Sequence, residues 1–350
     1  MPEFQTPSIP RNVEGTPLRV VSIGGGTGLS TLLHGLKQYV VGHGSSPRGN
    51  MPVDIAAIVT VSDDGGSSGR LRREFDVLPP GDIRNCLVAL SEDETLLSRL
   101  FQYRFESGRG LKGHSFGNLF LTALTHITGD FPDAVKESSE VLAIKGRIYP
   151  ATASKVALEA VLENGRHVLG ETRISKSRHR IETVYLRPRR CRPLPDTLAA
   201  IAQADVITLG PGSLFTSVIP NLLVTGIADA IRRSPAVKAY FVNLMWQPGE
   251  TTNFSASQHI DAIHRHARGK LLDYAVLNTR EIRPALRRRY ARQASAPVEN
   301  DFDAIGAMGV NVVCGDLVQE SDVVRHNSDA IAAIAIELAV EGRERRQKSR

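Results

Sequence analysis

Short apolar runs rich in β-branched residues recur along the chain, and segments with the apolar spacing of helices lie between them. Continuous apolar runs of this kind are typical of parallel strands buried on both faces. Strands that alternate with helices predict an α/β, doubly wound sheet with helices on both faces. The predicted strands are Arg19–Ile23, Asp54–Val61, Asp205–Leu209, Lys238–Leu244, Tyr274–Leu277 and Val310–Cys314. The predicted helices are Leu29–Tyr39, Asp82–Leu90, Thr95–Phe105, Ser115–Ile127, Pro132–Ala143, Asn221–Ile231, Ser257–His266 and Asp329–Glu341.

One stretch in the middle of the chain departs from this alternation. The runs Val156–Val161 and His167–Ile174 flank an Asn-Gly pair at Asn164, and Asn-Gly between alternating runs is a strong hairpin signal. A third run, Ile181–Leu186, can extend the hairpin. We therefore expect residues 146–195 to form an antiparallel β-hairpin insertion within one doubly wound domain.

Both ends of the chain are polar. Residues 1–17 are rich in proline and lack the apolar segment of a signal peptide, which predicts a disordered leader. The basic run from Gly342 predicts a disordered tail over residues 342–350, which leaves residues 18–341 as a single domain. No segment approaches the ~20 apolar residues that span a bilayer, so we expect no membrane association.

Composition narrows the class of protein without identifying its function. Of the 350 residues, 41% are hydrophobic and 23% are charged, which is ordinary for a globular α/β protein. Three widely spaced cysteines have neither a disulfide pattern nor a metal-ligand spacing, which fits a reducing cytoplasm. The net charge of +6 favours anionic partners. Nucleic acid is disfavoured, because no aromatic residues interleave with the basic runs as base-stacking platforms would.

The first predicted strand runs directly into a glycine loop. Residues 19–30 read RVVSIGGGTGLS, so a strand, three glycines, Thr27 and Gly28 lead into a helix. Such a junction leaves backbone N–H groups uncovered at a helix N-terminus, which is a phosphate site. The loop is not the dinucleotide fingerprint, because position 29 is Leu, and no Gly-Lys-Ser/Thr of a P-loop follows. The expected ligand is therefore phosphorylated but not identified by either motif.

A second glycine loop, GPGS, follows the strand Asp205–Leu209. Gly210 and Gly212 permit close backbone approach to a ligand, and Ser213 can cap a helix or donate to phosphate. The alternative is a tight turn without a ligand. Ligands of open parallel sheets bind outside the carboxyl ends of the strands, at the switch point. Both loops follow predicted strands, and Asn243 comes directly after the apolar run Lys238–Val242 that begins another, so we expect them along one edge.

Asp63 and Asp64 come directly after the second predicted strand. Three roles are open for them: holding Mg²⁺ against a diphosphate, accepting hydrogen bonds from ribose hydroxyls, or forming an Asp-Asp-Gly-Gly turn. The following segment, which includes Gly66 and Ser67, is expected to be a flexible basic loop that orders over an anionic ligand.

Four further side chains precede or begin predicted helices. His114 is either an acid–base group or a neighbour of the cap residue Ser115. Asn118 can read a sugar or base edge with its amide. Arg84 is either a phosphate clamp or a partner in a surface salt bridge, and Asp82 is an N-cap or a first-turn anion.

Together these loops resemble the gluconeogenesis factor family (YvcK-type proteins), within the phospholactate transferase-like (CofD-like) group. The resemblance extends from Arg19 to about Glu337. It rests on IGGGTG at Ile23, VTVSDDGGSSGRLR from Val59, PPGDIRN from Pro79, HSFGNL from His114, LGPGSLFTSVIPNLLV from Leu209, NLMWQPGET from Asn243 and VRHNSDAIA from Val324. Many family members have Asp where this chain has Asn327, so any pairing by that carboxylate is lost.

The resemblance implies a Rossmann-like fold, a bacterial cytoplasmic protein and binding of a nucleotide sugar such as UDP-N-acetylglucosamine. It also implies a role in cell shape, envelope precursor balance and gluconeogenic growth. The sister transferases use a nucleotide-diphosphate-linked donor and Mg²⁺, so a transferase is the alternative; no cofactor beyond possible Mg²⁺ is expected, and a homodimer is possible. The candidate ligand-binding residues are Gly25, Gly26, Thr27, Gly28, Asp63, Asp64, Gly66, Ser67, Arg84, Asn118, Gly210, Gly212, Ser213, Leu214, Asn243 and Arg325, with Asp63 and Asp64 also the candidate metal ligands.

Overall fold

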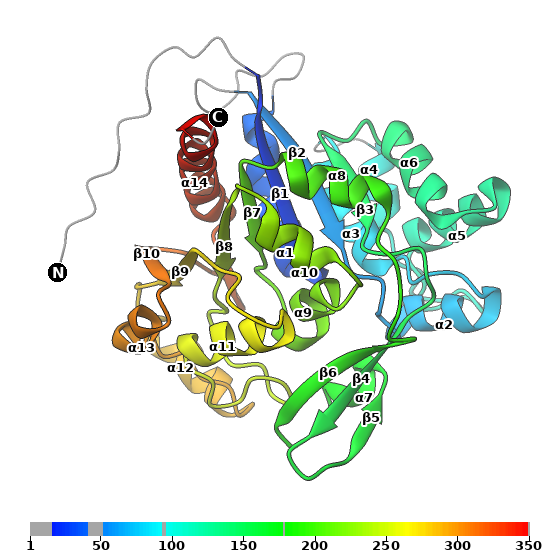
Figure 1. Ribbon diagram of the computed structural model, residues 1–350. Helices are drawn as coiled ribbons and strands as arrows, with labels where there is room; N and C mark the ends of the chain where they lie inside the picture. Colours follow the sequence, from blue (N-terminus) through cyan, green and yellow to red (C-terminus); the bar gives the residue numbers. More distant parts are fainter. Residues whose placement is uncertain (1–15, 41–51, 93–95, 178, 349–350) are drawn as a thin grey trace.

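Seven parallel strands form the central sheet of the computed structural model, which describes residues 16–40, 52–92, 96–177 and 179–348 (Figure 1). The predicted leader lies almost wholly outside these residues. The six predicted strands are confirmed, with ends that differ by a few residues, and β3 was missed. The strands are β1 (Leu18–Gly24), β2 (Val53–Val59), β3 (Arg147–Pro150), β7 (Val206–Leu209), β8 (Val237–Phe241), β9 (Tyr274–Asn278) and β10 (Asn311–Gly315).

The strand order reverses between β1 and β7. In the sheet the order is β10-β9-β8-β7-β1-β2-β3, and every neighbouring pair is parallel. The chain therefore builds outward from β1 through β2 to β3, and then returns to place β7 on the other side of β1. Connections leave β1 and β7 in opposite directions at this point, which opens a crevice outside their carboxyl ends.

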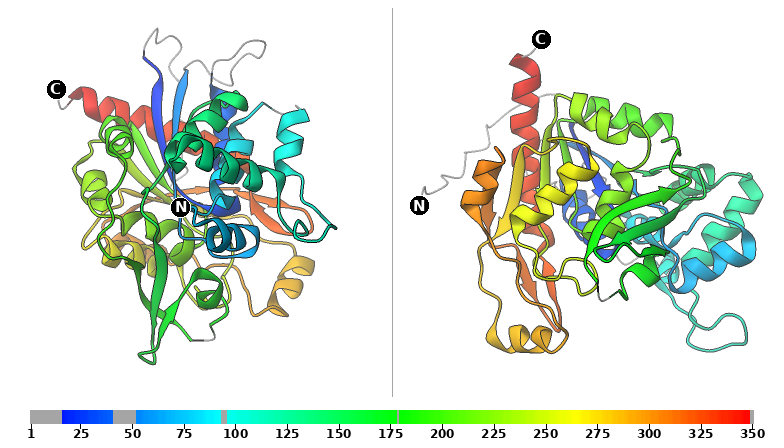
Figure 2. Two further views of the ribbon diagram at one scale, coloured as in Figure 1. Left: turned by 90° about the vertical axis from the view of Figure 1, so that its right-hand side faces the viewer. Right: turned by 60° about the horizontal axis from the view of Figure 1, so that its bottom comes forward.

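Helices cover both faces of the sheet (Figures 1 and 2). One face carries α1 (Gly26–Leu36), α3 (Gly81–Leu90) and α14 (Ser328–Lys348). The other carries α8 (Pro195–Gln203), α9 (Ile219–Leu222), α10 (Ile227–Arg233) and α11 (Ala256–His266). The strand side chains between these layers, such as Ile23 and Ile58, are fully buried, as a doubly wound fold requires.

A helix, α2 (Gly66–Phe75), replaces the flexible loop expected after Asp64, so that expectation was wrong. Leu71 and Ser67 of this helix are buried. Gly69 packs so closely that a Cβ there would lie 1.9 Å from the carbonyl oxygen of Asp64. Small residues that read as a flexible loop therefore permit a tight helix–loop contact. The other elements of this part are η1 (Lys37–Tyr39), α4 (Leu96–Gln102), α5 (Phe116–Thr128) and α6 (Phe131–Val141).

The insertion forms a separate three-stranded antiparallel sheet in the order β5-β4-β6, beside the carboxyl end of the main sheet (Figures 1 and 2). Its strands are β4 (Ala157–Leu162), β5 (His167–Leu169) and β6 (Ile181–Arg187). Two expectations need correction. The segment from residue 146 contains β3, which belongs to the main sheet. The second hairpin arm ends at Leu169, because Gly170 adopts φ +98° and the chain turns into α7 (Glu171–Ile174).

The predicted helix Asn221–Ile231 is broken near Gly226, which has φ +92°. The π-helical turn η2 (Leu214–Val218) continues into α9, and this segment meets α10 at 74°. Among the described residues, no single helix is long and apolar enough to cross a membrane; this bent pair passes that test only jointly, by length and composition. The last elements are α12 (Pro284–Ala291), α13 (Phe302–Ala307), β11 (Val318–Glu320) and β12 (Val324–His326).

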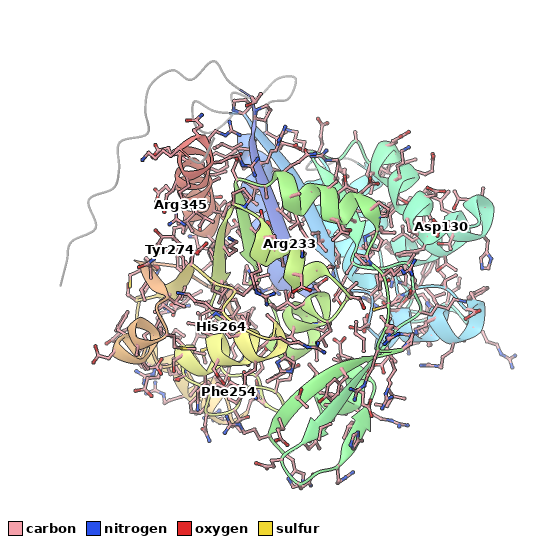
Figure 3. The ribbon with its side chains drawn as sticks, in the orientation of Figure 1. Asp130, Arg233, Phe254, His264, Tyr274 and Arg345 are labelled. Atoms are coloured by element: carbon pink, nitrogen blue, oxygen red, sulfur yellow. The ribbon has the colours of Figure 1, made fainter. Side chains whose placement is uncertain are left out.

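The basic residues after Gly342 continue α14 to Lys348, so the expected disordered tail was wrong for these residues. Arg343 donates to the carboxylate of Asp205 at 2.5 Å and to the carbonyl oxygens of Thr16 and Pro17. Arg345 lies over the ring of Tyr274 at 5.8 Å, where Figure 3 shows the two side chains together. The helix persists because its basic side chains have partners on the amino-terminal edge of the sheet.

Replacing Arg343 by Met should lower the free energy of unfolding by about 3 kcal/mol, because it leaves the nearly inaccessible Asp205 carboxylate without its counter-charge. Urea denaturation at pH 7 measures the change. Arg73→Met, which removes an exposed arginine from α2, is the matched control and should change stability by less than about 0.5 kcal/mol. Equal effects of the two variants would contradict a stabilising role for the Arg343–Asp205 pair.

Candidate functional site

The two predicted glycine loops touch each other at the switch point. A Cβ on Gly28 would lie 2.4 Å from the carbonyl oxygen of Pro211, which is closer than any side chain permits. Gly26 and Gly210 have φ of +62° and +71°, a region that favours glycine. The glycines of both loops therefore serve close approach and turning, and the loops form one continuous wall.

A cavity of about 500 Å³ opens in front of this wall. It is bounded by the two glycine loops, the loop after β8, α12 and β12. Its lining includes Gly25, Gly26, Thr27, Gly28, Thr31, Ser175, Gly212, Ser213, Ser217, Asn243, Met245, Trp246, Gln247, Glu250, Tyr290, Arg325 and His326. The structure thus brings Gly25–Gly28, Gly212, Ser213, Asn243 and Arg325 of the predicted site together around one space.

A chain of hydrogen bonds joins the loop after β8 to the second glycine loop. The amide of Gln247 donates to the Ser213 hydroxyl at 2.7 Å, and the amide of Asn243 donates to Gln247 at 3.0 Å. The Tyr240 hydroxyl in turn lies 3.5 Å from the Asn243 side-chain oxygen. Ser213 therefore accepts from Gln247 and does not cap the following helix, for which no side-chain cap is present.

The carboxyl group of Glu250 lies at the N-terminus of the helix that follows the second loop. The buried carboxyl of Glu250 accepts from the hydroxyls of Thr216 and Ser175 at 3.2 Å each. It also accepts from the backbone N–H groups of Phe215 and Thr216, while burial raises its pKa. This helix terminus is thus occupied from within, which leaves Gly212 and Ser213 to face a ligand.

The helix after the first loop is different. No side chain caps α1, whose N-cap residue is Gly25. The N–H of Gly26 donates to Asp82, and a Cβ on Gly25 would lie 2.6 Å from an Asp82 carboxyl oxygen. Asp82 therefore supports the loop from behind, while Thr27 and Gly28 line the cavity at the positive end of the helix dipole. This terminus is the stronger candidate for a phosphate.

Five acidic side chains interact electrostatically behind and beside the first loop: Asp63, Asp64, Asp82, Glu171 and Glu250, here called the carboxylate cluster. Burial, with a contribution from Asp63, raises the pKa of Asp82 to about 7. Burial and the other four carboxylates raise the pKa of Glu171 to about 10. Part of each side chain is exposed, yet both carboxyl groups lie among protein atoms. Both carboxyl groups therefore hold a proton more readily in the folded protein than an exposed carboxyl group does.

Asp63 and Asp64 do not line the cavity. Asp63 accepts from the N–H of Gly65 at 2.8 Å, in a turn that starts α2. Asp64 accepts from the N–H and hydroxyl of Thr172 at 2.9 and 2.7 Å, which fastens α7 of the insertion to this loop. Across the described ranges, no three His, Cys, Asp or Glu side chains are grouped so that they could hold a metal ion.

The remaining predicted residues do not line this cavity. Arg84 lines a separate cavity next to it. The Ser67 hydroxyl is hydrogen-bonded to Nδ1 of the His114 ring at 2.9 Å. Asn118 is buried at the start of α5, and its side-chain oxygen has no hydrogen-bond partner among the described residues. Gly66, Gly210 and Leu214 belong to the loops and helix starts and are outside the cavity lining.

Sequence reasoning missed several residues of the site. Glu171 and Ser175 arrive on the insertion, and no local pattern marks them. Tyr290 comes from α12, far along the chain, and its hydroxyl accepts from the N–H of Val324 at 3.0 Å. Trp246 and Glu250 lie in the polar segment after β8, whose composition was the one available signal.

Comparison with known proteins places this chain among bacterial relatives. A family model described as 2-phospho-L-lactate transferase CofD matches residues 20–318. The chain is 45% identical over 328 residues to the gluconeogenesis factor of Bacillus subtilis, which covers 93% of this chain and 100% of that protein. It is 46% identical over 331 residues to the gluconeogenesis factor of Halalkalibacterium halodurans, covering 94% and 98%. A crystal structure of a Bacillus halodurans protein, 46% identical, matches with a TM-score of 0.86 over 92% of this chain and 100% of that one.

Replacing Asp82 by Asn should stabilise the protein more at pH 8 than at pH 4. The folded-state pKa, about 7, exceeds the ordinary 3.8, so folding takes up a proton and the stability that this group contributes is lost as pH rises from about 4 through 7. The free energy of unfolding of the variant should exceed that of the original protein by an amount that grows over this pH range to at most about 4 kcal/mol. Urea denaturation at both pH values measures it, with the exposed Asp133→Asn as the control. A gain that does not depend on pH would show that Asp82 is not perturbed.

Proposed function

Because the chain belongs to the gluconeogenesis factor family, within the CofD family, we propose that it is a cytosolic regulator that binds a nucleotide sugar such as UDP-N-acetylglucosamine. Through this ligand it would report on envelope precursors and support cell shape during gluconeogenic growth. The observation that carries the binding proposal is the composition of the cavity: a glycine-loop cradle at one side, and Trp246, Tyr290 and Arg325 in the same lining.

Each part of a nucleotide sugar has a counterpart in this lining. The diphosphate would meet the N–H groups of Thr27 and Gly28 and the Gly212–Ser213 backbone. Trp246 and Tyr290 offer aromatic surface to a base, and the Asn243–Gln247 amides offer donors and acceptors for its edge or for the sugar. A volume of about 500 Å³ is in the range of small-molecule sites.

The carboxylate cluster is consistent with a divalent cation at the diphosphate. Mg²⁺ prefers oxygen ligands, and commonly binds through one or two carboxylates together with substrate phosphates and water. Asp63 and Asp82 would provide such carboxylates if a ligand phosphate reached beside the first loop, because neither residue lines the cavity itself, and Asp64 is held by Thr172. The ion would neutralise the repulsion between these groups and the ligand. The donor set alone is too small for a site without the phosphates.

A transferase is the second candidate. Two observations favour it: the family model is described as a phospholactate transferase, and the pKa of Asp82, raised to about 7, would allow this carboxyl group to exchange protons near neutral pH. In that case the same cavity would hold a nucleotide-diphosphate-linked donor, and an acceptor would have to enter beside the carboxylate cluster.

Replacing Gly26 by Asp should reduce affinity for UDP-N-acetylglucosamine at least 100-fold, because it places a carboxylate in the phosphate cradle. Isothermal titration calorimetry measures the affinity. Gly226→Asp, at another glycine of positive φ with no atom within 4 Å of a Cβ, carries the same charge outside the cavity and should bind normally. Equal affinities of both variants would rule out the cradle. Ligand recovered unchanged after incubation with Mg²⁺ supports a regulator, and altered ligand supports the transferase.

Addition of Mg²⁺ should strengthen binding of UDP-N-acetylglucosamine to the unmodified protein by about tenfold, and Asp63→Asn should abolish this difference while leaving metal-free binding intact. Titrations with Mg²⁺ and with EDTA measure both. Asp130→Asn, at an exposed position directly before α6 and outside the cavity lining, is the control. Affinity that is unaffected by Mg²⁺ in every protein would leave Asp63 with only its turn-forming role.

A further inference from the structure

A second cavity, of about 600 Å³, adjoins the one described above and has no part in the proposed function. It lies between α1, α3, α4 and the start of α14, with β11 and β12 at its border. Thr31, Arg325 and His326 line both cavities, so the two spaces meet at β12. The residues that line the second cavity and not the first include His34, Arg84 and Arg99.

Three arginines, Arg84, Arg99 and Arg325, line the second cavity, and of these Arg84 also interacts electrostatically with Asp82. Arg84, Arg99 and Arg325 form no ion pair in the described part of the chain, and no Asp or Glu is among its described lining residues. Unpaired cations around one space repel one another, and an anion would remove that cost. The arrangement therefore points to an anionic ligand.

Arg84 carries the clearest sign of a missing partner. Its guanidinium donates to the side-chain oxygen of the adjacent Asn85 at 2.6 Å, and its Nε is buried without a partner among the described residues. Burial and the nearby Arg104 lower the pKa of Arg84, while Asp82 raises it. An arginine shielded from water and left with an unsatisfied donor is a suitable contact for phosphate oxygens, which guanidinium groups bind in a bidentate manner.

The neutral part of the lining distinguishes the two cavities. The second contains the amides of Asn85, Gln102 and Gln319 and the hydroxyl groups of several serines, and no Phe, Tyr or Trp is present among its described residues. The first contains Trp246 and Tyr290. Amides and hydroxyls suit a ligand with many hydroxyl groups, whereas a flat base would find no aromatic surface here.

We propose that the second cavity binds a phosphorylated polyol, such as a sugar phosphate, at the same time as the nucleotide sugar occupies the first. The phosphate lies against Arg84 and Arg99, and the hydroxyl groups contact the amides of the lining. The site goes beyond the proposed function, because it adds a second ligand class and a means to regulate the first.

The shared strand provides the coupling between the two sites. β12 pairs with β11 along three residues. Its contact with the end of β8 is made by the His326 ring, whose Nε2 lies 3.2 Å from the carbonyl oxygen of Val242. Asn327, directly after it, accepts from the N–H groups of Asp329 and Ala330 at 3.1 Å each and so begins α14. An anion that draws Arg325 toward the second cavity changes the wall of the first, so occupancy at either site alters affinity at the other.

The test is calorimetric titration of glucose 6-phosphate, with uncharged glucose and inorganic phosphate as ligand controls. Glucose 6-phosphate should bind with one site per chain, both to the free protein and to protein saturated with UDP-N-acetylglucosamine, and the two affinities should differ. Glucose should not bind. Competition between the two ligands would show that one molecule fills both cavities and would overturn the proposal, as would equal affinity for inorganic phosphate.

Variants then locate the site. Arg99→Gln, at an exposed position that should not disturb folding, and Arg84→Gln should each weaken binding of glucose 6-phosphate about tenfold or more. Arg166→Gln, an exposed arginine at the hairpin tip, is the matched control. Gly26→Asp should still bind glucose 6-phosphate although it no longer binds the nucleotide sugar. The second site can therefore be tested even if the proposed function of the first cavity is wrong. If Gly26→Asp lost glucose 6-phosphate binding while Arg99→Gln bound it normally, the phosphate would lie in the first cavity and the proposal would be refuted.

Discussion

Gly28 and the carbonyl of Pro211 are so close that no Cβ fits between them, and the rest of the site depends on that contact. It exists because β1 and β7 are parallel neighbours whose following connections go to opposite faces of the sheet. The contact joins two loops that are far apart in the chain into one wall, and it sets the N-terminus of α1 against the Gly212–Ser213 backbone. Any larger residue at position 28 would separate the loops and widen the cavity between them.

The charges around this wall are unusually unbalanced. The first loop offers N–H groups to an anion, yet the carboxylate cluster lies directly behind it, and the Asp82 carboxyl is bonded to the same loop. Two ways of relieving the repulsion are compatible with the groups present: protons on Asp82 and Glu171, or a cation shared with the ligand. Either way, anion binding here is linked to a second equilibrium, because the bound phosphate and the ionised carboxylates each make the other less favourable. The helix after the second loop avoids the problem, since Glu250 already occupies its terminus.

Residues from distant parts of the chain close the crevice. The insertion contributes Ser175, and it is fastened to the site by the Thr172–Asp64 and Ser175–Glu250 hydrogen bonds. At the other side, Arg325 and His326 on the short strand β12 border both cavities. Elements held by few contacts are the ones best able to shift when a ligand binds. The sheet and glycine loops therefore supply the phosphate cradle, while β12, which pairs with β11 along three residues, can adjust its surroundings.

Local pattern in the sequence determined the parallel strands, most helices and the two glycine loops, because buried strands require continuous apolar runs and tight turns require glycine. The ordered motifs likewise determined the family. Pattern failed where small or charged residues acquire partners only on folding. Gly69 turns an apparent loop into α2 by packing on Asp64, and Asp205 with two carbonyl groups extends α14 through residues that read as a disordered tail. Tertiary structure alone decided which side chains face the cavity, that Asp82 stands behind the first loop, and that three arginines line a second cavity. Those outcomes depend on distances between residues remote in the chain, and local spacing carries no information about them.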